Sequence, residues 1–190
     1  MIFLGIDPGL RITGYGCVRL SASRAALVEA GVFRLARTDR ETGEAVSVSR
    51  RLVELDKDVR GLLARVRPGC VAVEGLFAHA AHPATAMIMG HARGVILLAA
   101  AQAGVRVVEI KPAEVKKFLT GSGRAEKGQM QRAIQDHFRL PALPQPPDVA
   151  DALAIALCAA ERSRLGVDAP ALVVKRSRAR RTLPTDVLNR

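Results

Sequence analysis

Short apolar runs separated by turn residues make up the N-terminal part of the chain. Residues 2–6 are nearly all apolar and β-favouring, which is typical of a buried central strand. Residues 11–20 and 26–35 are strand-like again, and only short turns separate the three runs. The pattern therefore predicts an antiparallel meander of three strands.

Residues 43–66 carry a clear helical pattern, because apolar side chains recur at alternating spacings of three and four. The apolar positions are Ala45, Val48, Leu52, Leu55, Val59, Leu62 and Val66. The seam covers only about three heptads, so we expect one amphipathic helix lying across a sheet. Coiled-coil pairing is the alternative.

Strands and helices alternate in the remainder of the chain. Residues 70–74 form an apolar run that stops on an acid, as the first run does, and residues 105–110 predict a fifth strand. Further helices are predicted at residues 84–103, 112–119, 125–138 and 148–164. The helix at 84–103 is apolar on most sides, which indicates wide burial or a subunit interface.

This order of elements predicts an α/β fold. Its five-stranded mixed sheet combines the antiparallel meander with parallel strands and carries helices on both faces. With 190 residues, one domain is the default. We assign residues 1–168 to this domain and residues 169–190 to a basic C-terminal tail that we expect to be flexible.

The net charge of the chain indicates what kind of partner the protein binds. Lys and Arg outnumber Asp and Glu by 29 to 18, which gives a net charge of +11. The tail contributes +5, so about +6 belongs to the domain. A basic body favours a polyanion such as nucleic acid, although a generally Arg-rich proteome would give the same excess.

Other features of the composition predict a cytoplasmic globular protein. Apolar residues make up 49% of the chain, which argues against general disorder. The longest apolar stretch, residues 95–103, is too short to span a bilayer, and no secretory signal is recognisable. Cys17, Cys70 and Cys158 form no metal-ligand pattern and are expected to be reduced, packed thiols.

A carboxylate stands at the end of the first strand, followed at once by proline and glycine. We expect Pro8 to stop the ladder, Gly9 to permit an unusual φ, and Asp7 to remain at the strand edge. An aspartate in this setting is most often a turn residue. The alternative is a catalytic or metal-binding carboxylate on a rigid sheet, and other parts of the chain must decide between the two.

Three further acids stand at the ends of predicted elements. Glu74 terminates an apolar strand as Asp7 does, so the two carboxylates would meet at one sheet edge if their strands are parallel neighbours. Asp148 and Asp151 are three residues apart at the start of an apolar helix and share one face. Glu74 could instead be a solvated turn acid, and Asp148 could complement the helix dipole. Asp151 is harder to explain by stability alone, because its neighbours are apolar.

Clustered carboxylates repel one another, so a protein keeps them together only if cations neutralise them. Ligands that are all oxygen select hard ions, Mg²⁺ or Mn²⁺. In a basic protein such a cluster indicates phosphodiester hydrolysis, in which two ions about 4 Å apart activate a water and stabilise the leaving 3′-oxygen.

Four sequence motifs carry a resemblance to a known family. They are GIDPG with the following RITGYG, VAVEGLF, VKKFLTGSGRAEK and DVADALAIA, and the match runs from residue 1 to about residue 164. They resemble the RuvC family of bacterial Holliday-junction resolvases, which belongs to the RNase H-like, or retroviral integrase, superfamily. The resemblance implies an RNase H-like fold and a quartet of catalytic, metal-binding acids. The quartet falls on Asp7, Glu74, Asp148 and Asp151, and family members vary between Asp and His at the position of Asp148.

The resemblance also implies roles for residues that are otherwise ordinary. Phe77 matches an aromatic residue that the family stacks against bases at the opened centre of the junction. The simpler interpretation of Phe77 is a phenylalanine of the hydrophobic core. Lys116 and Lys127 match basic residues near the scissile phosphate, where they would bind DNA and stabilise charge, whereas lysines at helix ends are ordinarily just solvated. Many relatives have Gln at the position of Gly75. Arg11 is expected to be solvated or, less commonly, to touch a phosphate.

Other chemistries fit the sequence less well. Residues 120–127 superficially resemble a phosphate-binding loop but lack the second glycine before the lysine and the Ser or Thr after it. The four histidines, at positions 79, 82, 91 and 137, form no convincing metal or nucleophile set. An actin-like ATPase is disfavoured because the chain lacks room for two lobes.

The resemblance implies a homodimeric, Mg²⁺-dependent endonuclease that resolves four-way DNA junctions by paired symmetric nicks, with two metal ions in each site. Attack by a metal-activated water would leave 5′-phosphate and 3′-hydroxyl ends. The resemblance places this activity in homologous recombination and DNA repair. It also implies a branch-migration motor complex as a partner. Two alternatives are an RNase H-like nuclease acting on another nucleic acid and a junction-binding protein without catalysis.

Overall fold

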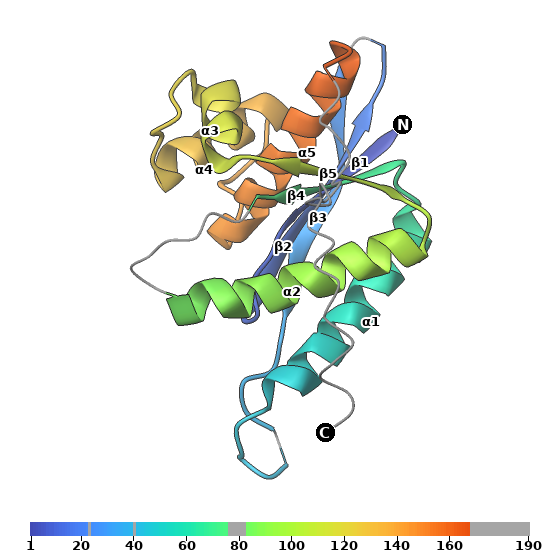
Figure 1. Cartoon of the computed structure of the whole chain (residues 1–190). Helices are drawn as coiled ribbons and strands as arrows, with labels where there is room; N and C mark the ends of the chain where they lie inside the picture. The colour runs from blue at the N-terminus through green and yellow to red at the C-terminus, as the bar shows by residue number, and fades with distance from the viewer. Residues whose placement is uncertain (23, 40, 76–82, 168–190) are drawn as a thin grey trace, which may run out of the picture.

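The computed structural model describes residues 1–22, 24–39, 41–75 and 83–167 (Figure 1). Phe77 and the tail at residues 169–190 lie outside the described residues. The base-stacking role of Phe77, the flexibility of the tail and the boundary of the domain therefore stay predictions.

Five strands form one mixed sheet at the centre of the molecule (Figure 1). They are β1 (Ile2–Asp7), β2 (Ile12–Leu20), β3 (Ala25–Arg34), β4 (Cys70–Glu74) and β5 (Arg106–Ile110). Their order across the sheet is β3-β2-β1-β4-β5, with antiparallel pairing from β1 to β3 and parallel pairing from β1 to β5. The predicted meander and mixed sheet are confirmed.

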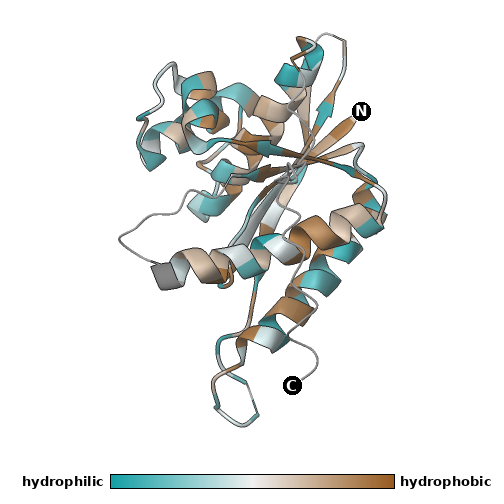
Figure 2. Ribbon diagram, viewed as in Figure 1, coloured by the Kyte–Doolittle hydropathy of each residue, from teal (hydrophilic) through white to brown (hydrophobic). Residues whose placement is uncertain are grey.

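Helices cover both faces of this sheet, as predicted (Figure 1). The helices α1 (Val48–Val66) and α2 (Pro83–Gln102) pack on one face. The other face carries α3 (Pro112–Thr120), α4 (Lys127–Phe138) and α5 (Pro147–Arg164). Figure 2 shows brown, apolar strands enclosed between helices that carry teal, polar residues on their surfaces. None of the helices in the described part of the chain has the length and apolar character needed to cross a membrane.

The start of α1 differs from the prediction. The helix begins at Val48 and not at residue 43, because the Ser47 side chain caps it by accepting a hydrogen bond from the Arg50 N–H at 3.3 Å. Ala45 is not part of the helix and pairs with Thr38 in an isolated β-bridge. The remaining apolar positions lie on α1, where Leu55, Val59 and Leu62 are buried.

Contact between α5 and the sheet depends on glycines in β1 and β2. An added Cβ at Gly5 would lie 2.2 Å from the carbonyl oxygen of Ala152, and one at Gly14 would lie 2.1 Å from that of Asp148. Real Cβ atoms essentially never approach another heavy atom so closely. Only glycine therefore lets the helix backbone touch the strands, and this contact sets where the first turn of α5 lies.

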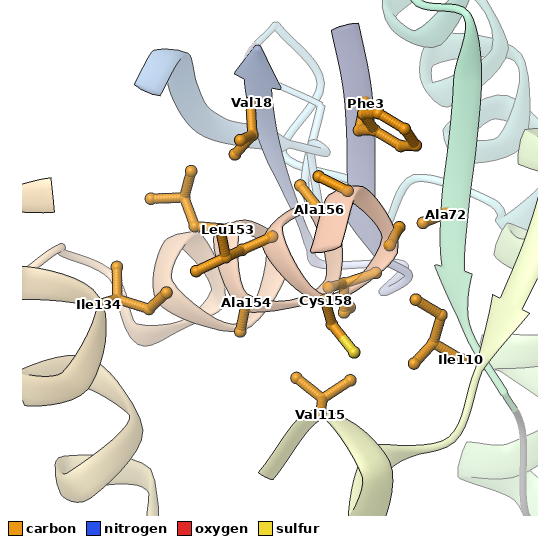
Figure 3. Close-up of a cluster of buried hydrophobic side chains, with 14 of the residues drawn as sticks. Phe3, Val18, Ala72, Ile110, Val115, Ile134, Leu153, Ala154, Ala156 and Cys158 are labelled. Atoms are coloured by element: carbon orange, nitrogen blue, oxygen red, sulfur yellow. The ribbon is translucent and has the colours of Figure 1, made fainter. Parts of the chain in front are cut away.

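Small side chains complete the same interface. Every residue of α5 from Ala152 to Ala160 is buried, and five of these are alanines. Figure 3 shows Leu153 and Ala156 of α5 beside Val18 and Phe3 of the sheet, with Val115 on the opposite side of the helix. The helix is thus enclosed by protein, in keeping with its apolar sequence.

Candidate active site

Asp7 is the last residue of β1 and is partly buried. The turn that follows is held by Thr13, whose buried hydroxyl donates to the Gly9 carbonyl at 2.5 Å and accepts from the Gly9 N–H at 3.2 Å. The expectation of an unusual φ at Gly9 is wrong, because Gly9 is not among the positive-φ residues. Glycine is required there because an added Cβ would lie 2.2 Å from the carbonyl oxygen of Ile12. The turn is therefore fixed by steric contact and by one threonine.

Glu74 lies beside Asp7 at the same edge of the sheet. Ile6 and Val73 are partners in the parallel pairing of β1 and β4, and each acid is the next residue of its strand. Arg93 of α2, only 12% exposed, donates from Nε to the Glu74 carbonyl at 3.3 Å and forms an ion pair with Glu109. The end of β4 is thus attached to both α2 and β5.

The first turns of α5 bring the other two acids to this edge. Asp148 is in the first turn of α5 and Asp151 lies one turn later, and both line the same cleft as Asp7 and Glu74. Gly14 of β2 contacts the Asp148 backbone and is also the pairing partner of Asp7 in β1. The end of β1, the start of β2 and the first turn of α5 therefore meet at one point. The structure therefore brings together all four acids that the sequence predicted.

The carboxylates interact electrostatically. Burial, with the charges of Glu74, Asp151 and Asp148, raises the pKa of Asp7 to about 8. Burial also raises the pKa of Glu74 and that of Asp151, and the negative charge of Asp151 adds to the rise at Glu74. The cluster is therefore unfavourable when fully ionised, and a bound cation would relieve the repulsion.

Two lysines oppose these shifts. The charge of Lys127 lowers the pKa of Asp7, Glu74 and Asp151, and the charge of Lys116 lowers that of Glu74 and Asp151. Lys116 lies on α3, and Lys127 is the first residue of α4, where a positive charge is unfavourable for the helix dipole. Both predicted lysines therefore face the acids, and Lys127 does so at a cost to its own helix.

The acids and the lysines line one cleft of about 1090 Å³. Its donors are carboxylate oxygens, which fit a hard divalent cation such as Mg²⁺ or Mn²⁺. Among the described residues, no three His, Cys, Asp or Glu side chains are grouped as ligands around one point. The four acids thus line an open cleft with oxygen atoms that suit a divalent cation. They do not surround one point as a closed coordination shell does.

Comparison with known proteins identifies the family. The family model described as crossover junction endodeoxyribonuclease RuvC matches residues 3–159. A curated relative of that name from Rhodopirellula baltica is 46% identical over 155 residues, which cover 82% of this chain and 83% of the relative. The chain belongs to the RuvC family.

Solved structures of RuvC agree with this assignment. The Thermus thermophilus RuvC structure superimposes with a TM-score of 0.75 and 34% sequence identity, covering 88% of this chain and 98% of that one. A second structure, T. thermophilus RuvC in complex with Holliday junction substrate, gives a TM-score of 0.74 at 32% identity, with the same coverage. The predicted RNase H-like fold class is confirmed.

Several residues of this RuvC-family cleft were not predicted from the sequence. They are Arg37, Val46, Arg51, Thr85, Ile88 and Met89. Arg51 could have been noticed, because it stands three residues after Val48 and four before Leu55, on the apolar side of α1. Arg37 and Val46 lie in the connection between β3 and α1, and Thr85, Ile88 and Met89 lie on α2, so no local pattern indicates that they share a cleft.

Proposed function

We propose that this protein is a structure-selective endonuclease that resolves four-way, Holliday-type DNA junctions in homologous recombination and DNA repair. The observation that carries the proposal is the cleft in which acids from β1, β4 and α5 lie beside two lysines. Membership of the RuvC family and the similarity to a RuvC bound to a Holliday junction substrate support the choice of substrate.

The proposed reaction is hydrolysis of a phosphodiester to 5′-phosphate and 3′-hydroxyl ends. Asp7, Glu74, Asp148 and Asp151 would hold Mg²⁺, with Mn²⁺ as a substitute and two ions in each site. Bound there, the ions supply Lewis acidity, which lowers the pKa of a water molecule and offsets charge on the leaving oxygen. Lys116 and Lys127 contact the DNA phosphate and stabilise the charge that develops on it.

Paired symmetric nicks require two copies of the site, and the outer surface of α2 is the proposed homodimer interface. Met87 is 65% exposed and Leu98 is 53% exposed on this helix, and neither lines the acidic cleft. A two-fold dimer through such an apolar surface would place one acidic cleft on each of two symmetry-related strands. A branch-migration motor complex as a further partner, and a cytoplasmic location, complete the proposal by analogy with the family.

Cleavage of a synthetic four-way junction with Mg²⁺ tests the proposal, with a linear duplex and an RNA–DNA hybrid as competing substrates. We expect cleavage of the junction only, and Asp7→Asn should abolish cleavage while it preserves junction binding. Asp136→Asn is the matched control, because Asp136 is exposed on α4 and does not line the cleft. Preferred cleavage of the hybrid would support an RNase H-like nuclease instead, and binding without cleavage would support an architectural protein.

The domain assignment is part of the same proposal. Residues 1–168 would form the nuclease domain, and the basic tail at residues 169–190 would add affinity for DNA. Removing residues 170–190 should then weaken junction binding and reduce its dependence on salt concentration. Equal affinities of the two proteins across a salt series would assign no binding role to the tail.

A further inference from the structure

Three arginines line the cleft together with the acids and the lysines. Arg11 lies in the turn after β1, Arg37 lies in the connection between β3 and α1, and Arg51 lies on α1. They come from three segments that are distant in sequence, whereas Lys116 and Lys127 come from α3 and α4 on the other side of the sheet. The cleft therefore has cations from both layers of the fold.

Hydrogen bonds fix the backbone that carries these arginines. The Leu35 N–H donates to the Arg11 carbonyl at 3.1 Å, and the Val46 N–H donates to the Arg37 carbonyl at 2.9 Å. Arg51 donates from Nη1 to the Leu10 carbonyl at 3.3 Å. The turn after β1, the end of β3 and the start of α1 are thus joined, so Arg11 and Arg37 extend from a defined frame.

The described residues between β3 and α1 make contacts with one another and with α1. The Asp39 N–H donates to the Glu44 carbonyl at 2.8 Å, and the Asp39 carboxylate pairs with Arg50 of α1 at 3.1 Å. Figure 1 shows this segment extending past the first turn of α1. Arg37 stands at its base, next to the Thr38–Ala45 bridge.

Arg11 and Arg37 have no charged partner within the part of the chain that the structure describes. Both side chains are exposed, and neither forms an ion pair or a side-chain hydrogen bond with any residue that the structure describes. By contrast, Arg50, Arg60 and Arg65 of α1 all pair with carboxylates. The lysines, and not these arginines, are the cations that lower the pKa of the clustered acids.

Arg51 has a different part in this arrangement. Its Nε is buried and has no hydrogen-bond acceptor among the described residues, while its Nη1 donates to the Leu10 carbonyl in the turn that carries Arg11. The Arg51 side chain as a whole is partly buried, so the guanidinium lies in the wall of the cleft and leaves this buried donor unsatisfied, which is unusual in proteins. Arg51 is a positioning residue for the turn and adds to the positive potential there.

We propose that Arg11 and Arg37, supported by Arg51, form a second phosphodiester-binding subsite in the cleft. This inference rests on the proposed function, because the phosphodiester belongs to the nucleic acid that is cut. A guanidinium binds phosphate oxygens through paired N–H donors and stays charged at any physiological pH. The strand would be held at one phosphate by the two lysines and at another by the arginines, with the acids between them.

Such a subsite contributes to binding and alignment more than to the chemical step. Each phosphate contact releases counterions, so its loss lowers the magnitude of the slope of log Kobs against log salt by about 0.7 to 0.9. Replacing both arginines should therefore lower that magnitude by about 1 to 2 and weaken junction binding about tenfold or more at fixed salt. The rate at saturating junction should change less than the affinity.

The test measures junction binding across a salt series in an Asp7→Asn background, for the parent and for Arg11→Gln/Arg37→Gln. Arg19→Gln is the matched control, because Arg19 is exposed on β2 and pairs with Ile2 at the opposite end of the sheet from Asp7. Arg11→Lys/Arg37→Lys keeps the charges and should retain most of the slope while it loses part of the affinity. Thermal unfolding confirms that each variant is folded.

The two proposals fail in different ways. If the wild-type protein neither cuts nor prefers the four-way junction, the proposed function fails. If the wild-type protein cuts the junction but Arg11→Gln/Arg37→Gln has the same slope and affinity as Arg19→Gln, the arginine subsite is wrong. A loss of rate at saturating junction with unchanged affinity would also overturn the subsite.

Discussion

The two faces of the sheet are packed in different ways. On the α5 side, glycines of β1 and β2 let the helix backbone touch the strands, and alanines make up much of the buried helix surface. On the other side, larger side chains such as Leu4 and Ile6 of β1 meet Leu55 of α1 and Ile96 of α2. Successive residues of one strand thus serve a tight interface and an ordinary side-chain core.

This difference explains where the acids are placed. Contact between backbones leaves little freedom for adjustment, whereas long apolar side chains can change rotamers to absorb small shifts. Asp148 and Asp151 belong to the helix on the tight face, and their positions relative to Asp7 are set by steric contact. The core under α1 and α2 supplies stability without setting that geometry so closely.

Gly14→Ala should have the largest effect of the changes considered. The added methyl group would lie 2.1 Å from the Asp148 carbonyl oxygen, so α5 must move or the strand must bend. We expect a loss of about 1–3 kcal/mol or more in the free energy of unfolding, together with a loss of junction cleavage. Chemical denaturation and a junction cleavage assay measure the two effects. Full cleavage in a stable Gly14→Ala protein would contradict a tightly set α5.

The charge cluster should make stability depend on pH. The pKa of Asp7 is raised from 3.8 to about 8, so between these values the folded protein holds a proton that the unfolded chain has released. Stability without divalent cations should therefore fall as pH rises through this window, and Mg²⁺ should reduce the fall. Asp7→Asn should make the dependence shallower and raise the Tm near pH 8 by about 2–4 °C for each 1 kcal/mol of repulsion removed.

Thermal unfolding from pH 5 to pH 9 in the presence of a chelator measures this dependence. Asp136→Asn is again the control, because it removes a carboxylate that is exposed on α4. An equally steep fall in Asp7→Asn and in wild type would show that the acids at the cleft do not repel one another as described.

Ile96→Val should have a smaller effect, restricted to stability. Ile96 is fully buried on α2, so the loss of one methylene group should cost about 0.5–1.5 kcal/mol. Junction cleavage at saturating substrate should not change, because the core under α1 and α2 can adjust. A large loss of cleavage in a folded Ile96→Val protein would remove the contrast between the two faces.

Gly61→Ala should have the smallest effect and the opposite sign. Gly61 lies in the interior of α1, and an added Cβ there meets nothing within 4 Å. Alanine should stabilise the helix by up to about 1 kcal/mol with no change in cleavage. Paired with Gly14→Ala, it separates the steric effect at the α5 interface from the general effect of replacing a glycine.

The sequence predicted the elements that have a strong local signal. Apolar runs that stop on Asp7 and Glu74 indicated two strand ends, and parallel pairing of β1 with β4 makes those ends adjacent. The start of α1 was misplaced because residues before Val48 continue the apolar spacing, while the cap at Ser47 and the Thr38–Ala45 bridge end the helix there. A capping hydroxyl competes with periodicity, and here the cap decides the boundary.

The remainder of the cleft could not be predicted from local patterns. Arg37 and Ile88 line it only because the β3–α1 connection and α2 fold toward the ends of β1 and β4. Gly14 and Gly16 share one strand face, but nothing in their spacing identifies α5 as the helix that meets them. Long-range contacts of this kind depend on topology and not on local sequence.

Arg93 connects α2 to the active site. The same helix carries the exposed residues of the proposed dimer interface and, through Arg93, hydrogen-bonds the end of β4 where Glu74 begins the turn. Any movement of α2 on association would therefore be transmitted to Glu74, one of the four clustered carboxylates. The two active sites of a dimer would then share one adjustable connection, and the activity of each subunit would depend on whether its partner is present.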